Sequence, residues 1–371
     1  MTLSRRDLLW SSLALPAFAA KPGGEQPNIV LLLADGVGAW MLPCYGNKET
    51  QVPHIDRLAA TGTRFFNHYA AAPVPVAGRT ALLTGRFSGD ATLDKFLPAA
   101  GYACQTVTGG AAAVKFIETQ SSDKPFCLVA GFAPYQSTPD ARYLAPYAKA
   151  TFDTFAQEPP AKNAARNRER LGPALLENLR KAAAATTALD DEIGAISAAL
   201  AQKRIAEHTL IIFTAPSGSL FGAHGLWGDG EASSPINMYD EVVNTPMIWS
   251  WPGRVPPMAL RPEMISALDL VPTLCVLTGA DLPARDLTGR SYMSLASGQP
   301  LPKKQPWKTT VVARYGNTAM ARVDRYKLIV RDGGKGPGEL YDDKQDPHER
   351  VNQYDNPQFV TVKTSLRAAL G

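Results

Sequence analysis

Short apolar runs alternate with amphipathic segments along most of this chain. Each run is bounded by turn-forming or acidic residues, and its length suits a strand that is buried on both faces. The runs cover residues 28–35 (NIVLLLAD) and begin again at Cys104 (CQTVTGG), Phe126 (FCLVAGF), Thr209 (TLIIFTA) and Pro246 (PMIWSWP). The pattern therefore predicts a largely parallel sheet.

Helical patterns lie between these runs. Residues 54–62 (HIDRLAATG) place their apolar side chains on one side and end at a glycine, as a helix would. A second helix is expected in RTALLTG, which begins at Arg79, and a long one within residues 173–203, where leucine and isoleucine recur at helical spacing. Strands that alternate with helices predict an α/β sandwich.

The pattern changes near residue 300. Residues 301–307 are rich in proline and lysine and are expected to connect two units. Beyond them the alternation predicts a small antiparallel sheet, covered by a helix over residues 357–370. We therefore expect an α/β domain over residues 21–300 and a C-terminal subdomain over residues 301–371. Residues 137–171 are predicted to be a surface loop that is only partly ordered.

The first twenty residues are typical of an export signal. Arg5 and Arg6 precede an apolar run over residues 8–20 that ends in Ala17-Phe18-Ala19, a small-residue cleavage pattern. This predicts a twin-arginine signal over residues 1–20 and a periplasmic or secreted protein; an uncleaved anchor and a chance match are the alternatives. No other segment is apolar enough to span a bilayer, so no membrane attachment is expected after cleavage.

Charge and cysteine content narrow the function classes further. The net charge of +4 is small and dispersed, which argues against a nucleic-acid partner. The cysteines, Cys44, Cys104, Cys127 and Cys275, are not spaced like zinc ligands. Cys104 and Cys127 lie in strand-like runs and are expected to be buried free thiols. Export would permit a disulfide, but the sequence assigns none.

The order of several segments resembles the sulfatase family of the alkaline-phosphatase superfamily. They are PNIVLLLAD, PCYGNKETQVPHIDRLAATGTRFFNHYAAAPV, GRTALLTGR, LDDEIGAI, HGLWG, MYDEVVNTPMIWSWPG and ELYDDKQDP. The resemblance spans nearly the whole chain after the signal. It implies an alkaline-phosphatase-like α/β sandwich with a central, mostly parallel sheet and a small C-terminal antiparallel subdomain.

The resemblance also implies a nucleophile that this chain lacks. Sulfatases carry a cysteine or serine in a C-x-P-S-R motif, and oxidation to formylglycine makes it the attacking group. Here Arg79 is the motif arginine, and Pro75 stands at the nucleophile position. Val76, Ala77 and Gly78 replace the residues between them. Proline has neither a thiol nor a hydroxyl, so no catalytic residue is expected.

The family's metal ligands are largely replaced as well. Active members hold calcium with an acidic pair after the first strand and a second polar pair after a later strand. The corresponding positions here are Asp35-Gly36 and Pro216-Ser217. Calcium prefers six to eight oxygen ligands, and one carboxylate of that set remains. We expect no bound metal or other cofactor, and we expect Asp35 to act in a turn or a helix cap.

The cations that bind sulfate in the family have no counterparts. The family's GKWH segment corresponds to residues 108–111 (TGGA), and its PH pair corresponds to Pro134-Tyr135. A lysine expected between HGLWG and MYDE is missing. Asp229 and Glu231 in that region carry the opposite charge, which would repel a sulfate ester.

A few polar residues remain as candidates. Arg79 could bind an anion at a helix start, or it could be a structural residue paired with Asp35 or a carbonyl. Thr80 is the nearest hydroxyl, but it is out of register and has no metal to activate it. His224 is expected to hold a turn. The other histidines lack a carboxylate at an informative spacing; they are His54, His68, His208 and His348.

These observations leave three hypotheses. The preferred one is an exported pseudoenzyme that binds a sulfated glycan or a protein partner. The alternative is an active sulfuric or phosphoric ester hydrolase whose site has been rebuilt; its residues would be Asp35, Arg79, His224, Asp229 and Glu231. The third is an assembly role, which an apolar patch near the shortened segments after Arg86 and Gly110 would favour.

Overall fold

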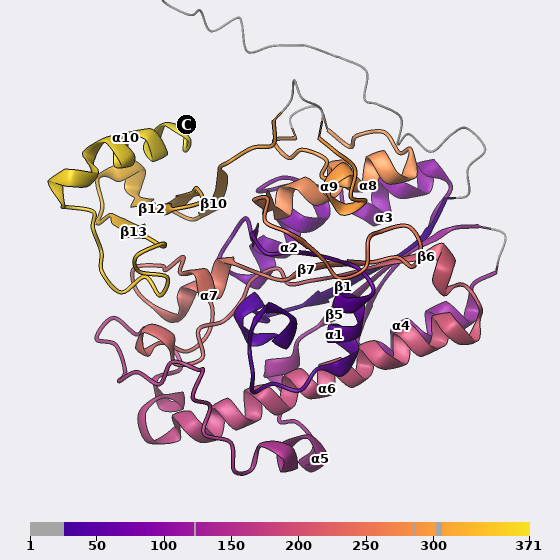
Figure 1. Cartoon of the computed structure of the whole chain (residues 1–371), viewed down its shortest axis with the longest axis horizontal. Coiled ribbons are helices and arrows are strands. Elements are labelled where there is room, and N and C mark those ends of the chain that lie inside the picture. Colours follow the sequence, from indigo (N-terminus) through magenta and orange to yellow (C-terminus); the bar gives the residue numbers. More distant parts are fainter. Residues whose placement is uncertain (1–25, 122–123, 285–286, 302–305) are drawn as a thin grey trace, which may run out of the picture.

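The computed structural model describes residues 26–121, 124–284, 287–301 and 306–371. The predicted export signal and part of the predicted connector lie outside the described residues. Within them the chain forms a central sheet between two layers of helices and a separate small sheet near the C-terminus (Figure 1). The α/β sandwich with a second, antiparallel unit is therefore confirmed.

The central sheet has seven strands in the order β4-β5-β1-β6-β7-β2-β8. β1 pairs in parallel with both β5 and β6, and β4 pairs in parallel with β5. β7 runs antiparallel to β6 and β2, so the sheet is mostly and not entirely parallel. The strands are β1 (Asn28–Ala34), β2 (Thr63–Phe65), β4 (Ala103–Thr108), β5 (Phe126–Phe132), β6 (Thr209–Thr214), β7 (Met247–Ser250) and β8 (Ala259–Arg261).

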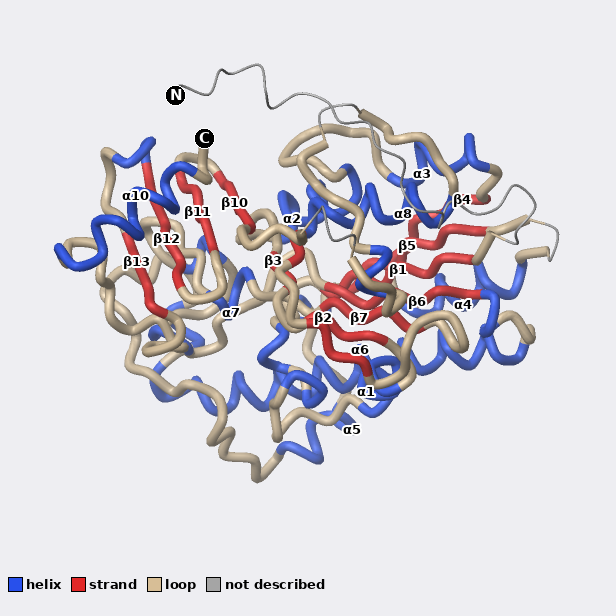
Figure 2. The backbone as a smooth tube through the Cα atoms, turned by 45° about the horizontal axis from the view of Figure 1, so that its top comes forward, coloured by secondary structure: helices blue, strands red, loops and turns tan. Residues whose placement is uncertain are grey.

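Helices bury both faces of this sheet (Figure 2). Ile29 and Leu31 of β1 point into one apolar cluster, and Val30 and Leu32 point into the other. This alternation explains why β1 is an uninterrupted apolar run. One layer consists of α2 (Pro75–Thr84), α3 (Leu93–Phe96), α8 (Leu270–Thr278) and α9 (Met293–Ala296). The other consists of α1 (Pro53–Ala60), α4 (Gly110–Thr119) and α6 (Leu175–Gln202).

The C-terminal sheet has four antiparallel strands, as the alternation predicted. They are β10 (Val311–Tyr315), β11 (Thr318–Arg322), β12 (Tyr326–Arg331) and β13 (Glu339–Asp342). α10 (Val360–Ala368) covers one face, and its Leu366 packs in a cluster with Leu328 and Leu340. A short parallel pair, β3 (His68–Tyr69) with β9 (Ile265–Ser266), lies near the start of β10.

Most of residues 137–171 lie at the surface, as predicted, but the expectation that this segment is only partly ordered was wrong. The segment contains α5 (Ala141–Leu144) and buries Tyr147, Phe152 and Phe155 in one cluster against α6. Phe152 lies between the other two rings, stacked on Tyr147 and edge-on to Phe155. The segment is polar in composition, so the sequence did not reveal the role of these aromatic residues. Their burial stabilises the segment against α6.

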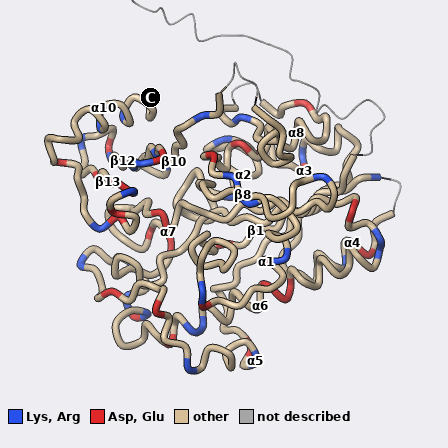
Figure 3. Tube along the Cα trace, viewed as in Figure 1, with Lys and Arg blue, Asp and Glu red and all other residues tan. Residues whose placement is uncertain are grey.

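Basic and acidic side chains are interspersed along the trace (Figure 3). Among the described residues, no helix combines the length and the hydrophobicity that crossing a membrane requires.

Candidate functional site

Four parallel strands bring their carboxyl ends together at one edge of the central sheet. Asp35 follows β1, and its N–H donates to Phe132 at the end of β5 over 2.9 Å. The N–H of Gly36 donates to Ser217, which follows β6, over 3.0 Å. The N–H of Gly109, after β4, donates to Gly131 over 2.9 Å. Ligands of open α/β sheets bind at such an edge.

Arg79 reaches this edge from α2 and pairs with Asp35. Its Nη2 lies 2.7 Å from Oδ1 and 2.6 Å from Oδ2 of that carboxylate. The Asp35 side chain is 17% exposed and that of Arg79 is 36% exposed. Burial raises the pKa of Asp35, and Arg79 offsets only part of that rise. The structural pairing that the sequence offered as one interpretation of Arg79 is present, and the two charges cancel.

The position of the family's nucleophile is the first residue of α2. Pro75 needs no N–H there, because the first N–H groups of a helix have no partner inside it. The next side chain, Val76, is 81% exposed. The hydroxyl of Thr80 donates to the carbonyl of Val76 over 3.2 Å, inside the helix. Neither Pro75 nor Thr80 therefore supplies an activated nucleophile.

The edge has little room for the side chains that the family places there. A Cβ added to Gly78 would lie 2.0 Å from the carbonyl oxygen of Pro216. A Cβ added to Gly36 would lie 2.9 Å from the Ser219 hydroxyl and 2.9 Å from the Tyr135 ring. Gly36 also has a φ of +81°, which disfavours any other residue. The glycines allow the loops to pack directly on one another.

A calcium ion does not fit the residues at this edge. Asp35 supplies one carboxylate, and both of its oxygens already accept from Arg79. Pro216 and Gly36 carry no side-chain donor atoms. The Ser217 hydroxyl is fully buried and has no hydrogen-bond partner in the described structure, but a single neutral oxygen cannot replace the missing carboxylates. No mechanistic step through calcium follows.

The segments that correspond to the family's sulfate-binding residues have structural roles. At the start of α4 the N–H of Gly110 donates to Oε2 of Glu192 over 2.5 Å, so a carboxylate occupies this helix terminus. The Tyr135 hydroxyl lies 3.0 Å from that of Thr186, and its ring packs edge-on against Phe221. Tyr135 thus contributes to packing inside the fold.

The acids proposed for a rebuilt site have other partners. Glu231 pairs with Arg166 and accepts from the Tyr315 hydroxyl over 2.8 Å. Asp229 accepts the backbone N–H of Glu231 over 2.9 Å, and burial raises its pKa. Within the described chain, these two acids and Asp35 do not form a group with ligand atoms within 4.8 Å of one another. These acids are therefore not arranged to share one metal ion.

His224 has the structural role that was expected. Its backbone has a φ of +57° in the turn Ala223–Gly225, and its N–H donates to Glu158 over 3.1 Å. The ring stacks on Tyr239 at 3.5 Å, and Nε2 lies 3.5 Å from Oε2 of Glu241. Burial opposes ionisation of Glu241, but His224 more than offsets this and lowers its pKa.

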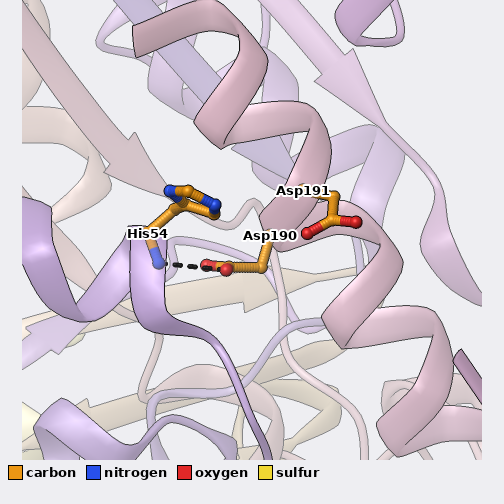
Figure 4. A group of neighbouring side chains, drawn as sticks. All are labelled: His54, Asp190 and Asp191. Carbon is orange, nitrogen blue, oxygen red and sulfur yellow. Dashed lines mark hydrogen bonds between the residues drawn. The ribbon is translucent and has the colours of Figure 1, made fainter. Parts of the chain in front are cut away.

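One group of three potential metal ligands exists among the described residues: His54, Asp190 and Asp191 (Figure 4). Asp190 accepts the backbone N–H groups of His54 over 3.0 Å and Ile55 over 2.7 Å, and so caps the start of α1. Burial raises its pKa to about 6. This capping explains the position of Asp190 without a metal, although the group could hold a divalent ion. The sequence missed the group because His54 and Asp190 are 136 positions apart.

The fold and the edge together define an α/β protein of the alkaline-phosphatase type with a small C-terminal antiparallel sheet. The family model described as "Sulfatase" matches residues 27–96 and 102–280, and the model described as "N-sulphoglucosamine sulphohydrolase, C-terminal" matches residues 234–371. The chain belongs to the sulfatase family.

Individual relatives agree with this assignment. Human arylsulfatase A is 27% identical over an alignment of 366 residues, which covers 77% of this chain and 71% of that protein. Mouse steryl-sulfatase is 45% identical over 75 residues, which cover 20% of this chain and only 12% of that protein.

Two solved structures share the fold at low identity. A protein in complex with its substrate D-glucosamine-2-N,6-O-disulfate has a TM-score of 0.80 at 20% identity, covering 93% of this chain and 97% of that one. The phosphonate monoester hydrolase of Agrobacterium radiobacter has a TM-score of 0.75 at 17% identity, covering 93% and 95%. At these identities the likeness concerns the fold alone.

Proposed function

We propose that this chain is an exported sulfatase-family protein that binds a partner and does not hydrolyse sulfate esters. The observation that carries the proposal is Pro75 at the first position of α2, where the family places its nucleophile. A pyrrolidine ring offers no oxygen or sulfur to attack a sulfate ester and cannot be converted to formylglycine.

The surroundings of Pro75 support the same conclusion. An enzyme of this class needs a cation to stabilise the charge of the transferring group. Asp35 neutralises the charge of Arg79, and the Glu192 carboxylate accepts the first N–H of α4. Tyr135 is a neutral residue whose hydroxyl lies within hydrogen-bond distance of Thr186. Restoring a single residue would therefore not restore the site.

The charge at the site bears on the choice of partner. Both a sulfated glycan and a protein are candidates, and the substrate of the structural neighbour, a disulfated glucosamine, gives the glycan a concrete form. The charge of Arg79 is already paired with Asp35 through Nη2, which weakens its attraction for a sulfate. The side chain of Val76, three positions before Arg79, is apolar and exposed to solvent. These features favour a protein partner over a sulfated ligand.

The test is a hydrolase assay on the purified chain without its first twenty residues. A chromogenic aryl sulfate is supplied with added calcium, and the Arg79→Ala variant is the matched control. We expect both proteins to hydrolyse the aryl sulfate no faster than the background rate. Turnover that disappears both in Arg79→Ala and with a chelator would refute the proposal and favour the rebuilt hydrolase; an aryl phosphate assayed in parallel extends the test to phosphoric esters.

The partner class is tested by calorimetry with D-glucosamine-2-N,6-O-disulfate. We expect no saturable binding to this sugar, because Arg79, the cation described at this edge, is already paired with Asp35. Saturable binding that Arg79→Ala abolishes would identify a sulfated ligand instead.

A further inference from the structure

Two cysteines lie opposite one another on adjacent strands of the central sheet. Cys104 of β4 is in register with Cys127 of β5 in a parallel pair. Both side chains face the same apolar cluster, on the side of the sheet covered by α2, α3, α8 and α9. Side chains at paired positions on one face are direct neighbours.

The two thiols interact. A hydrogen bond with the Cys127 thiol lowers the pKa of Cys104, although burial and the nearby Asp94 act in the opposite direction. The same hydrogen bond and burial raise the pKa of Cys127 well above its usual value. Cys104 is also the less buried of the two thiols, so we expect it to react first.

The position of the pair suits reaction with an external oxidant. β4 is the outermost strand on its side of the sheet, and Cys104 is half-buried whereas Cys127 is buried. Neighbouring strands are about 4.8 Å apart, a spacing within the range of Cα separations that disulfides span. Because β4 pairs on one side only, it can adjust to the geometry of a bond.

The remaining cysteines, Cys44 in the short helix Pro43–Tyr45 and Cys275 in α8, lie outside the strands and have no cysteine in register with them. Burial raises the pKa of Cys44 to about 12, with a further contribution from Asp56. Burial raises the pKa of Cys275 to about 11. Thiols of this kind are poor nucleophiles near neutral pH.

We propose that Cys104 and Cys127 are a redox-active dithiol that forms a disulfide when the protein meets a small-molecule disulfide. The Cys104 thiolate attacks one sulfur of the oxidant, so that a mixed disulfide forms and one thiol leaves. Cys127, on losing its proton, attacks the Cys104 sulfur and releases the second thiol. The protein loses two electrons and two protons, and the oxidant is reduced to two thiols. An oxidising compartment, as the predicted export would provide, favours this state.

The experiment treats the folded protein with oxidised glutathione, quenches the reaction with acid, alkylates free thiols under denaturing conditions and maps the peptides. We expect a single linked peptide pair that joins Cys104 to Cys127, and a fall from four alkylated cysteines to two. Four alkylated cysteines after prolonged treatment, or oxidation of Cys44 or Cys275 at the same rate, would overturn the proposal.

Variants assign the order of the steps. Cys127→Ser is expected to trap glutathione on Cys104, whereas Cys104→Ser should leave Cys127 unmodified. Cys275→Ser, the matched control, should form the disulfide as the unaltered chain does. Glutathione that stays on Cys104 when Cys127 is present would contradict the second step. The unaltered chain provides the main readout, so the test stands even if a variant does not fold.

Discussion

The carboxyl edge of the central sheet and the junction with the C-terminal sheet differ in how they hold charge. At the edge Arg79 pairs with Asp35, and both side chains are partly buried. At the junction Lys327 of β12 is fully buried and contacts Asp240, at the start of α7 (Asp240–Val243), and Glu349. At the edge the two charges pair only with each other, whereas the junction joins several buried charges in one network.

The junction is densely connected. Nζ of Lys327 lies 2.5 Å from Oε1 of Glu349 and donates to the carbonyl of Met238 over 3.1 Å. Burial lowers the pKa of Lys327, but Asp240 and Glu349 more than offset this, and the pKa rises. Arg322 and Asp343 extend the network with a contact of 2.6 Å.

The two regions differ in how much their ion pairs contribute to the stability of the fold. A buried ion pair is costly to form and is disrupted severely when one partner is removed, so its loss would weaken the attachment of the C-terminal sheet to the main domain. The pair of Arg79 with Asp35 contributes less, because water screens the partly exposed guanidinium.

The largest expected effect is that of Lys327→Met. The substitution leaves Asp240 and Glu349 buried without a cation, which is expected to lower the free energy of unfolding by about 3–5 kcal/mol. Urea unfolding monitored by fluorescence measures this loss. Lys344→Met removes an exposed lysine paired with the exposed Asp324 and is the matched control. If the two variants are equally stable, the junction does not differ from the surface in the way described.

Gly78→Ser tests how tightly the edge is packed. The family has serine at this position, but here the new Cβ would meet the carbonyl of Pro216. We expect a loss of about 1–3 kcal/mol from overpacking. Ala77→Ser, one position earlier and partly exposed, is the matched control and should be nearly neutral. A stable Gly78→Ser variant would show that the edge can still accommodate the family's motif.

Much of the fold followed from the sequence, because periodicity reports burial directly. The β1 run is apolar at every position since both of its faces are covered, and the residue 357–370 prediction located α10 within a few positions. The 137–171 segment was misjudged because a few aromatic anchors, not a periodic pattern, order it. Isolated anchors leave no repeating signal in a sequence.

The site was predictable only as a set of replacements. Pro75, Gly36 and Pro216 lack reactive groups, and the sequence alone showed this. That Glu192 occupies the start of α4 could not be foreseen, since it lies 82 positions from its partner Gly110. Contacts of this kind depend on how the helices pack, which no local pattern encodes.

Arg79→Ala is expected to have a smaller effect than either of the first two substitutions. It leaves Asp35 mostly buried without its cation, and the expected loss is about 1 kcal/mol near neutral pH. Arg79 holds down part of the rise in the pKa of Asp35, so in the variant that pKa is higher still. The difference in stability between the two proteins should therefore grow as the pH rises. Urea unfolding at acid and neutral pH measures it; a difference that does not vary with pH would mean that Asp35 carries no charge in either protein.

The smallest expected effect concerns Asp190, a buried acid that is held by two backbone N–H groups rather than by a cation. Its pKa is raised from 3.8 to about 6, so its contribution to stability is complete below pH 3.8 and is lost as the pH rises through 6. Asp190→Asn should remove this pH-dependent loss, while Asp191→Asn, an exposed neighbour, should retain it. Thermal unfolding across this pH range separates the two variants. An unchanged pH profile in Asp190→Asn would mean that capping α1 keeps the carboxylate ionised, and Asp190 would then resemble the charged junction more than the neutralised edge.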